Sequence, residues 1–268
     1  MNIDSYIAFP LVFALGLIFG SHANVIIFRY PLALSTVAPR SQCLNCNRTL
    51  SWYENLPLLS YLALRGRCRS CKQRISFIYP LVEFATGALF LASYVNVGLS
   101  QELISLLILG ALTFPMIVID IKYQKLPNQL TGLLWLLVSA TLLVESIVNS
   151  SFDGLVSALI QALAVAAIFI AIYIVTRGRG IGMGDIKLAP GLVLVTSQLG
   201  VGTTVVAFIL TFLIAGILAL VLLAFKKVTR KTRIAFGPFL IMGAWLSIFL
   251  SEDIRSKLLL LWGLKFKM

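Results

Sequence analysis

Apolar runs long enough to cross a lipid bilayer recur along this chain and constrain its fold more than any other feature. The first extends from Tyr6 to Phe28, and about 20 helical residues cross roughly 30 Å of hydrocarbon. No small-residue cleavage signature follows it, so we expect a retained membrane helix rather than a removed signal peptide. With 59% apolar and only 12% charged residues among 268, the sequence indicates a polytopic membrane protein.

Seven further apolar runs predict the remaining helices. They lie at about 79–97, 101–119, 130–148, 154–176, 187–199, 201–225 and 234–251. The run 187–199 is short and contains Pro190-Gly191, so we expect it to be tilted, broken or partly buried among other helices. The predicted fold is therefore an all-α polytopic membrane protein with about eight transmembrane helices.

Positive charge alternates between the loops and predicts their orientation. Of the 22 Lys and Arg residues, eight lie in 29–78, two in 121–126, three in 177–187 and five in 226–233. The links near 98–102, 149–153 and 199–202 contain none. Because basic loops stay in the cytosol, we expect these four segments there and the N-terminus on the other side. Eight membrane crossings would place the basic C-terminal tail on the non-cytosolic side, which contradicts the rule that basic segments stay in the cytosol. The contradiction disappears if Leu258 to Leu264 lie along the membrane interface.

The formal net charge of +12 is explained by the same loops. Charge that gathers on one side of a membrane protein is what topology and anionic lipid headgroups require. A nucleic-acid partner, which a basic protein also permits, is therefore not expected. Membrane lipid is the partner that the charge predicts.

All four cysteines lie in the one sizeable aqueous segment, residues 29–78, between the first two predicted helices. They form two pairs, Cys43/Cys46 and Cys68/Cys71, with 21 residues between the pairs. Two such turns close a tetrahedral Cys₄ site around Zn²⁺, and a loop of this size has little core of its own. We expect a structural zinc site, because a full Cys₄ set leaves no open position for catalysis and a cytosolic loop is reducing. A redox dithiol is the alternative interpretation.

Two acids at the ends of apolar runs are the candidates for chemistry. Asp120 closes one run, and Asp185 follows a glycine-rich segment that contains Gly182 and Gly184. Both adjoin basic loops, so both carboxylates are expected at the cytosolic face. An ionised and a protonated carboxylate hydrolyse an amide together: one takes a proton from water while the other polarises the carbonyl. The only histidine, His22, lies inside the first run, which leaves no Ser-His or Cys-His pair elsewhere.

Other interpretations of the two acids remain open at this point. Aspartate is a good helix N-cap, so both residues are also explained as capping groups. A proton-coupled transporter uses membrane acids too, although it usually places them near the midplane on repeated, broken helices. No internal repeat is visible in this sequence.

The order of the motifs resembles that of a known family over nearly the whole chain. It is similar to the type IV prepilin leader peptidases, which are integral-membrane aspartyl proteases of the GxGD class. The motifs that carry the resemblance are Gly20-Ser-His-Ala-Asn-Val25, the four cysteines, Trp52 to Ser60, Arg65-Gly-Arg-Cys68, Tyr79-Pro-Leu-Val-Glu83, Asp120, Gly182-Met-Gly-Asp185 and Phe236-Gly-Pro238. His22, Leu44 and Ala235 depart from the usual pattern, which has an aromatic residue at the first position and prolines at the other two.

The resemblance implies a bifunctional enzyme in the bacterial cytoplasmic (inner) membrane. Such an enzyme removes the short basic leader from prepilin or pseudopilin precursors at the cytosolic face and N-methylates the new N-terminal residue with S-adenosylmethionine. Asp120 and Asp185 would be catalytic, with Gly182 and Gly184 in the active-site loop.

For methylation, the resemblance points to the cysteine loop with Gly66 and Glu83. A structural ion pair between Glu83 and an arginine such as Arg74 is the alternative. On this interpretation the chain comprises a first transmembrane helix (1–28), a Cys₄ zinc-type loop domain (29–78) and a transmembrane aspartyl protease core (79–268).

Two other classes of protein compete with this interpretation. One is a membrane transporter or proton-coupled carrier that uses its intramembrane carboxylates, and the other is a zinc-clipped scaffold without activity. The sequence does not specify which pilin-like precursors are cut, nor an oligomeric state.

Overall fold

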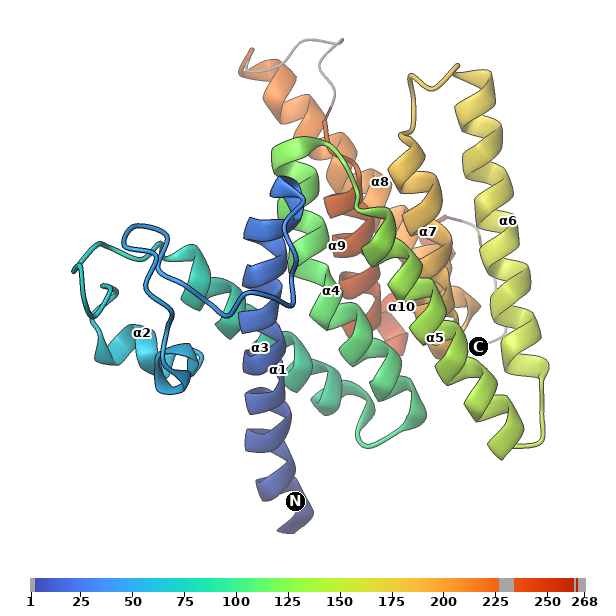
Figure 1. Cartoon of the computed structure of the whole chain (residues 1–268). Helices are drawn as coiled ribbons and strands as arrows, with labels where there is room; N and C mark the ends of the chain where they lie inside the picture. The colour runs from blue at the N-terminus through green and yellow to red at the C-terminus, as the bar shows by residue number, and fades with distance from the viewer. Residues whose placement is uncertain (1–2, 227–233, 263, 265–268) are drawn as a thin grey trace. The chain divides into compact units, whose positions relative to one another are not determined.

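The computed structural model describes residues 3–226, 234–262 and 264, and in these residues it is built almost entirely of helices (Figure 1). The chain divides into two compact units, Met1–Val118 and Ile119–Met268. Within the described ranges, six helices are long and apolar enough to cross a membrane. The predicted all-α, multi-pass membrane architecture is therefore confirmed.

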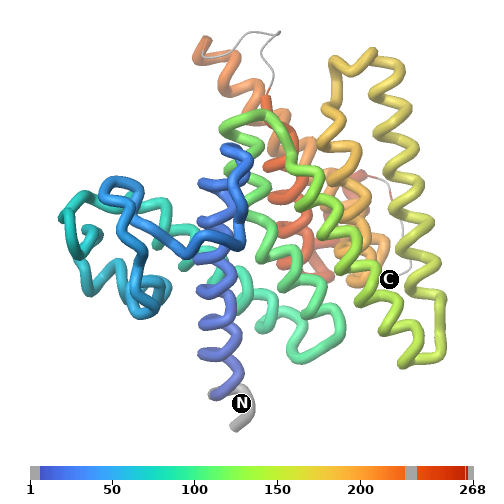
Figure 2. Tube along the Cα trace, viewed as in Figure 1, coloured from blue at the N-terminus to red at the C-terminus, as the bar shows by residue number. Residues whose placement is uncertain are grey.

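The first unit contains one long helix pair and the loop that connects it. Its elements are α1 (Ile3–Arg29), the 3₁₀ helices η1 (Tyr30–Leu32) and η2 (Trp52–Asn55), the short α2 (Leu59–Ala63), α3 (Ile78–Val97) and most of α4 (Gln101–Tyr123). The segment between α1 and α3 forms a lobe beside these two helices, which is clearest in the Cα trace of Figure 2. This lobe carries the four cysteines.

Small residues hold α1 and α3 close together. Gly16 and Gly20 are four residues apart on α1, and a Cβ atom added to either would lie 2.7 Å from the Cα atom of Gly87 or Glu83 on α3. Such a small-xxx-small pattern lets two membrane helices approach at backbone distance. The rings of Phe28 and Tyr79 stack 4.7 Å apart at the end of the pair nearest the loop.

The second unit surrounds one short, buried helix. Its elements are α5 (Asn128–Val148), α6 (Asp153–Val175), α7 (Met183–Thr196), η3 (Ser197–Leu199), α8 (Val201–Ala224), α9 (Gly237–Phe249) and α10 (Glu252–Leu261). Every residue from Leu188 to Thr196 is buried, and α7 packs mainly against α5, α6 and α9. Pro190 lies inside α7 without ending it. The expectation that this run would be partly buried in the bundle is confirmed.

Two of the eight expected spans are shorter than the rest. The six long apolar helices are α1, α3, α4, α5, α6 and α8. The other two, α7 and α9, have 14 and 13 residues, so neither has the roughly 20 residues of a full untilted span. Most of the basic loop expected at 226–233, namely 227–233, lies outside the described residues. In the basic C-terminal tail, Glu252–Leu261 form α10, and 265–268 lie outside the described residues.

A glycine on α9 allows the closest approach between helices of the second unit. A Cβ atom on Gly243 would lie 2.5 Å from the carbonyl oxygen of Ala207 on α8. We therefore expect Gly243→Leu to lower the free energy of unfolding by about 1–3 kcal/mol, as overpacking does. The measurement is thermal or denaturant unfolding in detergent micelles. Gly216→Leu on α8, where no atom lies within 4 Å, is the control, and equal stability of the two variants would contradict the expectation.

Candidate active site and metal centre

Asp120 lies in the last turn of α4 with 5% of its surface exposed. The negative end of a helix dipole is an unfavourable place for a carboxylate, so helix capping does not explain this residue. The backbone amide of Gly237, at the start of α9, interacts with the carboxylate. A Cβ atom added to Gly237 would lie 2.7 Å from Oδ2 of Asp120. This Oδ2 is buried and has no hydrogen-bond partner among the described residues.

Asp185 lies in the first turn of α7, which is not one of the six long apolar helices, and is 7% exposed. Its Oδ2 accepts a hydrogen bond of 3.1 Å from the backbone N–H of Gly182, the N-cap residue. The capping interpretation is therefore confirmed for Asp185 as a local contact. This capping contact fixes the Asp185 side chain at the start of α7, but it does not account for the electrostatic environment of the carboxylate.

The two carboxylates influence each other electrostatically. Burial raises the pKa of the Asp185 carboxyl to about 6, the hydrogen bond from Gly182 opposes this increase, and the negative charge of Asp120 adds to it. Gly184, next to Asp185, and Gly237, beside the Asp120 carboxylate, also share a neighbour, Leu126, because Cβ atoms added to either glycine would lie 3.0 Å from its side chain. The structure thus brings the two predicted acids to one place.

Hydrogen bonds tie the start of α7 to α5 next to the acids. The Lys187 ammonium donates to Oδ1 of Asn128 at 2.9 Å, and Nε1 of Trp135 donates to the backbone carbonyl of Lys187 at 2.9 Å. Sequence reasoning missed these polar contacts, because Asn128 and Trp135 are more than 50 residues from Lys187.

Like-charged carboxylates at close range share a proton, so the pair Asp120 and Asp185 is able to offer one acidic and one basic carboxyl group.

The four cysteines lie together in the first unit, as predicted. Their sulfur atoms all lie within 4.8 Å of one another, and the Sγ atoms of Cys43 and Cys71 are 3.8 Å apart. Four Zn–S bonds of about 2.3 Å in a tetrahedron place sulfur atoms about 3.8 Å apart. All four thiols are free, and a disulfide would need sulfurs about 2.05 Å apart. The geometry therefore fits a four-coordinate metal site.

Two similar turns produce this cluster. In the first turn, the Cys43 N–H donates to the Arg48 carbonyl and the Asn47 N–H donates to the Cys43 carbonyl. In the second turn, the Cys68 N–H donates to the Gln73 carbonyl and the Lys72 N–H donates to the Cys68 carbonyl. The residue after each pair, Asn47 or Lys72, has a positive φ of 53° or 57°. Each CxxC sequence thus folds into a turn that directs both thiols to one side.

Backbone amides favour the thiolate forms in the second turn. Hydrogen bonds from the N–H groups of Cys71 and Ser70 lower the pKa of Cys68 to about 6, and the N–H of Gln73 lowers the pKa of Cys71. Metals bind thiolates rather than thiols, so this environment suits a metal ligand. The first turn is held by an ion pair that sequence reasoning missed, from the half-buried Arg48 to the buried Glu54 at 2.6 Å.

Gly66 and Glu83 both lie in the first unit, beside the cysteine lobe. Gly66 has a φ of 65°, and a Cβ atom there would lie 2.9 Å from the Tyr61 ring. Oε2 of Glu83 accepts a hydrogen bond of 2.8 Å from the N–H of Leu58. The ion pairs among the described residues are Arg48–Glu54 and Arg255–Glu252, so the alternative pairing of Glu83 with Arg74 is not found there.

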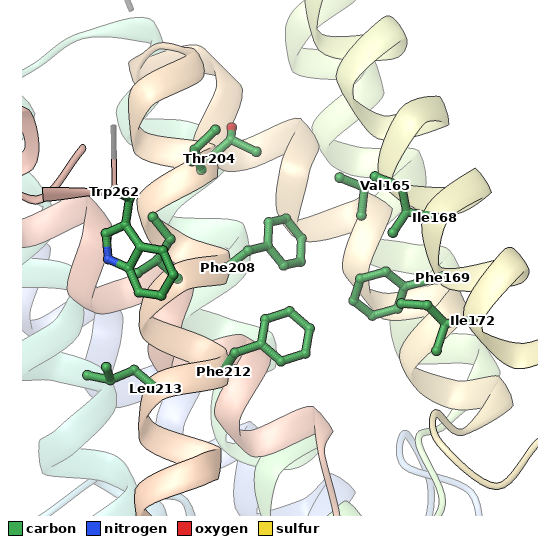
Figure 3. Close-up of a pocket in the computed structure, with 11 residues that line it drawn as sticks. Val165, Ile168, Phe169, Ile172, Thr204, Phe208, Phe212, Leu213 and Trp262 are labelled. Atoms are coloured by element: carbon green, nitrogen blue, oxygen red, sulfur yellow. The ribbon is translucent and has the colours of Figure 1, made fainter. Parts of the chain in front are cut away.

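The second unit has an apolar groove between α6 and α8. Its volume is about 600 Å³, and Figure 3 shows Phe208 and Phe212 on one side with Phe169 and Ile172 on the other. The Phe212 ring lies 5.5 Å from that of Phe236, the residue before Gly237. One residue of the groove lining, Phe212, thus packs against the segment that leads to Gly237 and Asp120.

Two family sequence patterns match the chain. One, described as "Bacterial Peptidase A24 N-terminal domain", matches residues 14–97, and the other, described as "Type IV leader peptidase family", matches residues 106–223. The second match contains Asp120 and Asp185, and the first contains all four cysteines.

Relatives named prepilin leader peptidase/N-methyltransferase align along most of the chain. One from Bacillus subtilis is 32% identical over 92% of this chain and 96% of its own length. One from Pseudomonas aeruginosa is 31% identical over 98% and 99% of the two chains, and one from Stutzerimonas stutzeri is 32% identical over 93% and 95%. The comparison with solved structures gave no match.

The sulfur geometry predicts about one zinc ion per chain in the purified protein. We expect the double variant Cys43→Ser, Cys46→Ser to lose it, because two ligands do not hold the ion in place. The measurement is elemental analysis of the protein in detergent. Ser70→Ala, an exposed residue between two ligands, is the control and should keep the metal. Full metal retention in the double variant would exclude the site.

Proposed function

The chain belongs to the type IV leader peptidase family, and we propose that it removes the basic leader from prepilin or pseudopilin precursors at the cytosolic face of the bacterial inner membrane. One observation supports this most strongly. Two buried acids, Asp120 and Asp185, come together from separate helix ends, and both lie in the stretch that matches the family pattern.

In the proposed reaction the two carboxyl groups share one proton. The ionised group takes a proton from a water molecule, which attacks the scissile carbonyl, while the protonated group donates a hydrogen bond to the carbonyl oxygen. The C–N bond then breaks as the first carboxyl returns its proton to the leaving amine. The buried Oδ2 of Asp120 supports this role, since no hydrogen bond from the described residues occupies this acceptor.

The glycines near the acids would admit the substrate backbone. Gly182 holds Asp185 through its N–H, and Gly237 leaves room beside Oδ2 of Asp120 that a side chain would fill. We propose that Gly182 and Gly184 form the active-site loop. A peptide bond at the membrane face reaches buried carboxylates only where backbone approaches backbone closely.

We further propose that the apolar groove of the second unit holds the apolar segment of the precursor. Its lining is almost wholly apolar, and the Phe212 ring in that lining packs against the Phe236 ring, next to Gly237. An apolar helix seated there would place the preceding peptide bond near the acids. Specificity would then depend on position in the membrane as well as on local sequence.

N-methylation is the second activity that we propose for this chain, as the names of the relatives indicate for them. The methyl donor would be S-adenosylmethionine, and the cysteine lobe, held by zinc, would help to form its site with Gly66 and Glu83. The proposed division of the chain is a first helix (1–28), a cytosolic loop domain (29–78) and a protease core (79–268). In this scheme the metal shapes the loop and takes no part in bond making.

The competing functions are less well supported. A proton-coupled carrier would place its acids at mid-depth on broken helices, whereas Asp120 lies in the last turn of α4 and Asp185 in the first turn of α7. A scaffold without activity would have no reason to keep two interacting carboxylates buried, because each costs several kcal/mol in an apolar setting.

We expect Asp120→Asn and Asp185→Asn each to reduce precursor cleavage by at least 1,000-fold, because an amide can neither take nor supply the proton. The measurement is the appearance of shortened product from a leader-bearing precursor mixed with the purified enzyme. Asp153→Asn, at an exposed helix start, is the control and should cleave normally. Near-normal processing by either active-site variant would exclude the dyad.

The groove makes a separate prediction about substrate affinity. Phe212 is 50% exposed in the groove, and we expect Phe212→Ala to raise the KM for the precursor about fivefold, corresponding to about 1 kcal/mol of lost apolar contact. The value of kcat should change little. Leu220→Ala, an exposed α8 residue that does not line the groove, is the control. An unchanged KM in Phe212→Ala would contradict the docking proposal.

A further inference from the structure

The first unit contains a cavity with polar side chains in its wall that the cleavage reaction does not use. It has a volume of about 790 Å³ and is lined by the cysteine lobe and by residues of α1 and α3. Among the polar side chains that line it, two are more than nine-tenths buried and belong to the facing helices: Asn24 of α1 and Glu83 of α3.

Asn24 has one satisfied and one unsatisfied polar atom. Its Nδ2 donates a hydrogen bond of 3.0 Å to the backbone carbonyl of Tyr79, which fixes the orientation of the amide. Its Oδ1 is buried and has no hydrogen-bond partner among the described residues. A buried acceptor without a partner is costly, so its position in the wall of a cavity indicates a donor that arrives with a ligand.

Glu83 lies beside Asn24 because of how α1 and α3 pack. It is one helical turn after Tyr79, and the Cα atom of Glu83 lies against Gly20, one turn before Asn24. Its carboxylate accepts the N–H of Leu58 at 2.8 Å and also interacts with the Ser21 side chain. The described residues give it no ion-pair partner. Two acceptors, one of them a carboxylate, thus lie at neighbouring positions in the cavity.

A ligand that satisfies both acceptors must donate hydrogen bonds, and the carboxylate favours one that also carries positive charge. A primary ammonium group does so, since it has three N–H donors and one charge. We propose that Asn24 Oδ1 and the Glu83 carboxylate bind the α-amine of the newly cleaved peptide, and that Glu83 takes a proton from it before methyl transfer. This inference rests on the proposed function and adds a binding site and two residue roles to it.

The proton has to leave before the nitrogen can react. A peptide α-amine has a pKa of about 7.7–8.0, so near neutral pH it arrives mainly as ammonium, without a lone pair. Transfer of one N–H proton to Glu83 leaves a neutral amine and a neutral carboxylic acid. The nitrogen lone pair then attacks the methyl carbon of the sulfonium donor, and the C–S bond breaks with its electron pair on sulfur. The products are a methylated ammonium group and a neutral thioether.

Other charged groups also line this cavity and contribute to its pH behaviour. They are Arg29 from α1 and Glu54, Arg69 and Arg74 from the lobe. Tyr61, Tyr79 and the cysteines Cys43 and Cys68 are the remaining titratable residues in its lining. The Glu54 carboxylate is engaged by Arg48, which leaves Glu83 as the carboxylate of the cavity that has no ion-pair partner among the described residues.

The experiment uses the full-length enzyme in detergent or nanodiscs with a labelled methyl donor. A synthetic peptide with a free N-terminus serves as acceptor, so methylation is measured without prior cleavage, and cleavage of a leader-bearing precursor is measured separately. The variants are Asn24→Ala, Asn24→Asp and Glu83→Gln. The controls are Asn96→Ala and Glu102→Gln, which replace the same residue types elsewhere in the first unit.

We expect Asn24→Ala to raise the KM for the peptide at least tenfold, as loss of a hydrogen bond to a charged group does. Asn24→Asp, which keeps an acceptor, should retain most of the affinity. The KM for the methyl donor should stay within twofold in both. Because the methyl donor also carries a primary ammonium group, a shift confined to the donor KM would assign these acceptors to the donor and overturn the proposal.

Glu83→Gln should lower the kcat for methylation at pH 7 at least 100-fold, the usual contribution of a general base. The deficit should shrink toward pH 9, where the peptide amine loses its proton without help. A loss that is independent of pH, or an equal loss of cleavage and methylation, would show a structural role and overturn the assignment. If the unaltered enzyme neither cleaves nor methylates, the proposed function fails; if it does both and the variants match it, only this inference fails.

Discussion

Carboxylates inside an apolar helix bundle are the constraint around which the second unit is arranged. An ionised carboxylate in a membrane costs several kcal/mol unless polar groups surround it, and Asp120 and Asp185 are both more than 90% buried. Each lies at a helix end, where a backbone amide of Gly237 or Gly182 reaches it. Glycine is suited to these positions because a side chain at Gly237 would occupy the space beside the carboxylate.

The same physical device, close backbone approach at glycine, also builds the first unit. Gly16 and Gly20 bring α1 against α3, and this contact places Asn24 next to Tyr79 and Glu83. Without the close contact between α1 and α3 the Asn24 amide would not be buried, and its Oδ1 would accept a hydrogen bond from water. The zinc-type lobe closes over the pair, since the carboxylate of Glu83 accepts the N–H of Leu58 from the lobe. Packing between small residues thus creates polar chemistry inside an apolar protein.

Much of the candidate site was predictable because its residues carry strong local signals. CxxC pairs predict a metal site from spacing alone, and an aspartate at the end of an apolar run is costly enough to demand a role. Asn24, Gly237 and Glu54 lie within the motifs of the family resemblance, but sequence reasoning assigned them no role of their own. A single Asn in an apolar helix or a Glu in a polar loop has no distinctive pattern, and each gains its meaning from a partner remote in sequence or folded against it. The run 234–251 overestimated α9, which covers Gly237–Phe249, and the short run 187–199 missed that α7 begins earlier, at Met183, because hydropathy does not reveal where a helix is capped.

Composition, hydropathy and charge in the sequence alone determined a multi-pass helical membrane protein with a cysteine lobe and two exceptional acids. These properties follow from the transfer of each segment between water and lipid, which depends on local composition. Only the tertiary structure decided which acids meet, which thiols share one centre and which buried acceptor lacks a partner. Such facts depend on distances between residues such as Asp120 and Gly237, more than 100 positions apart, and helix packing rather than local preference sets those distances.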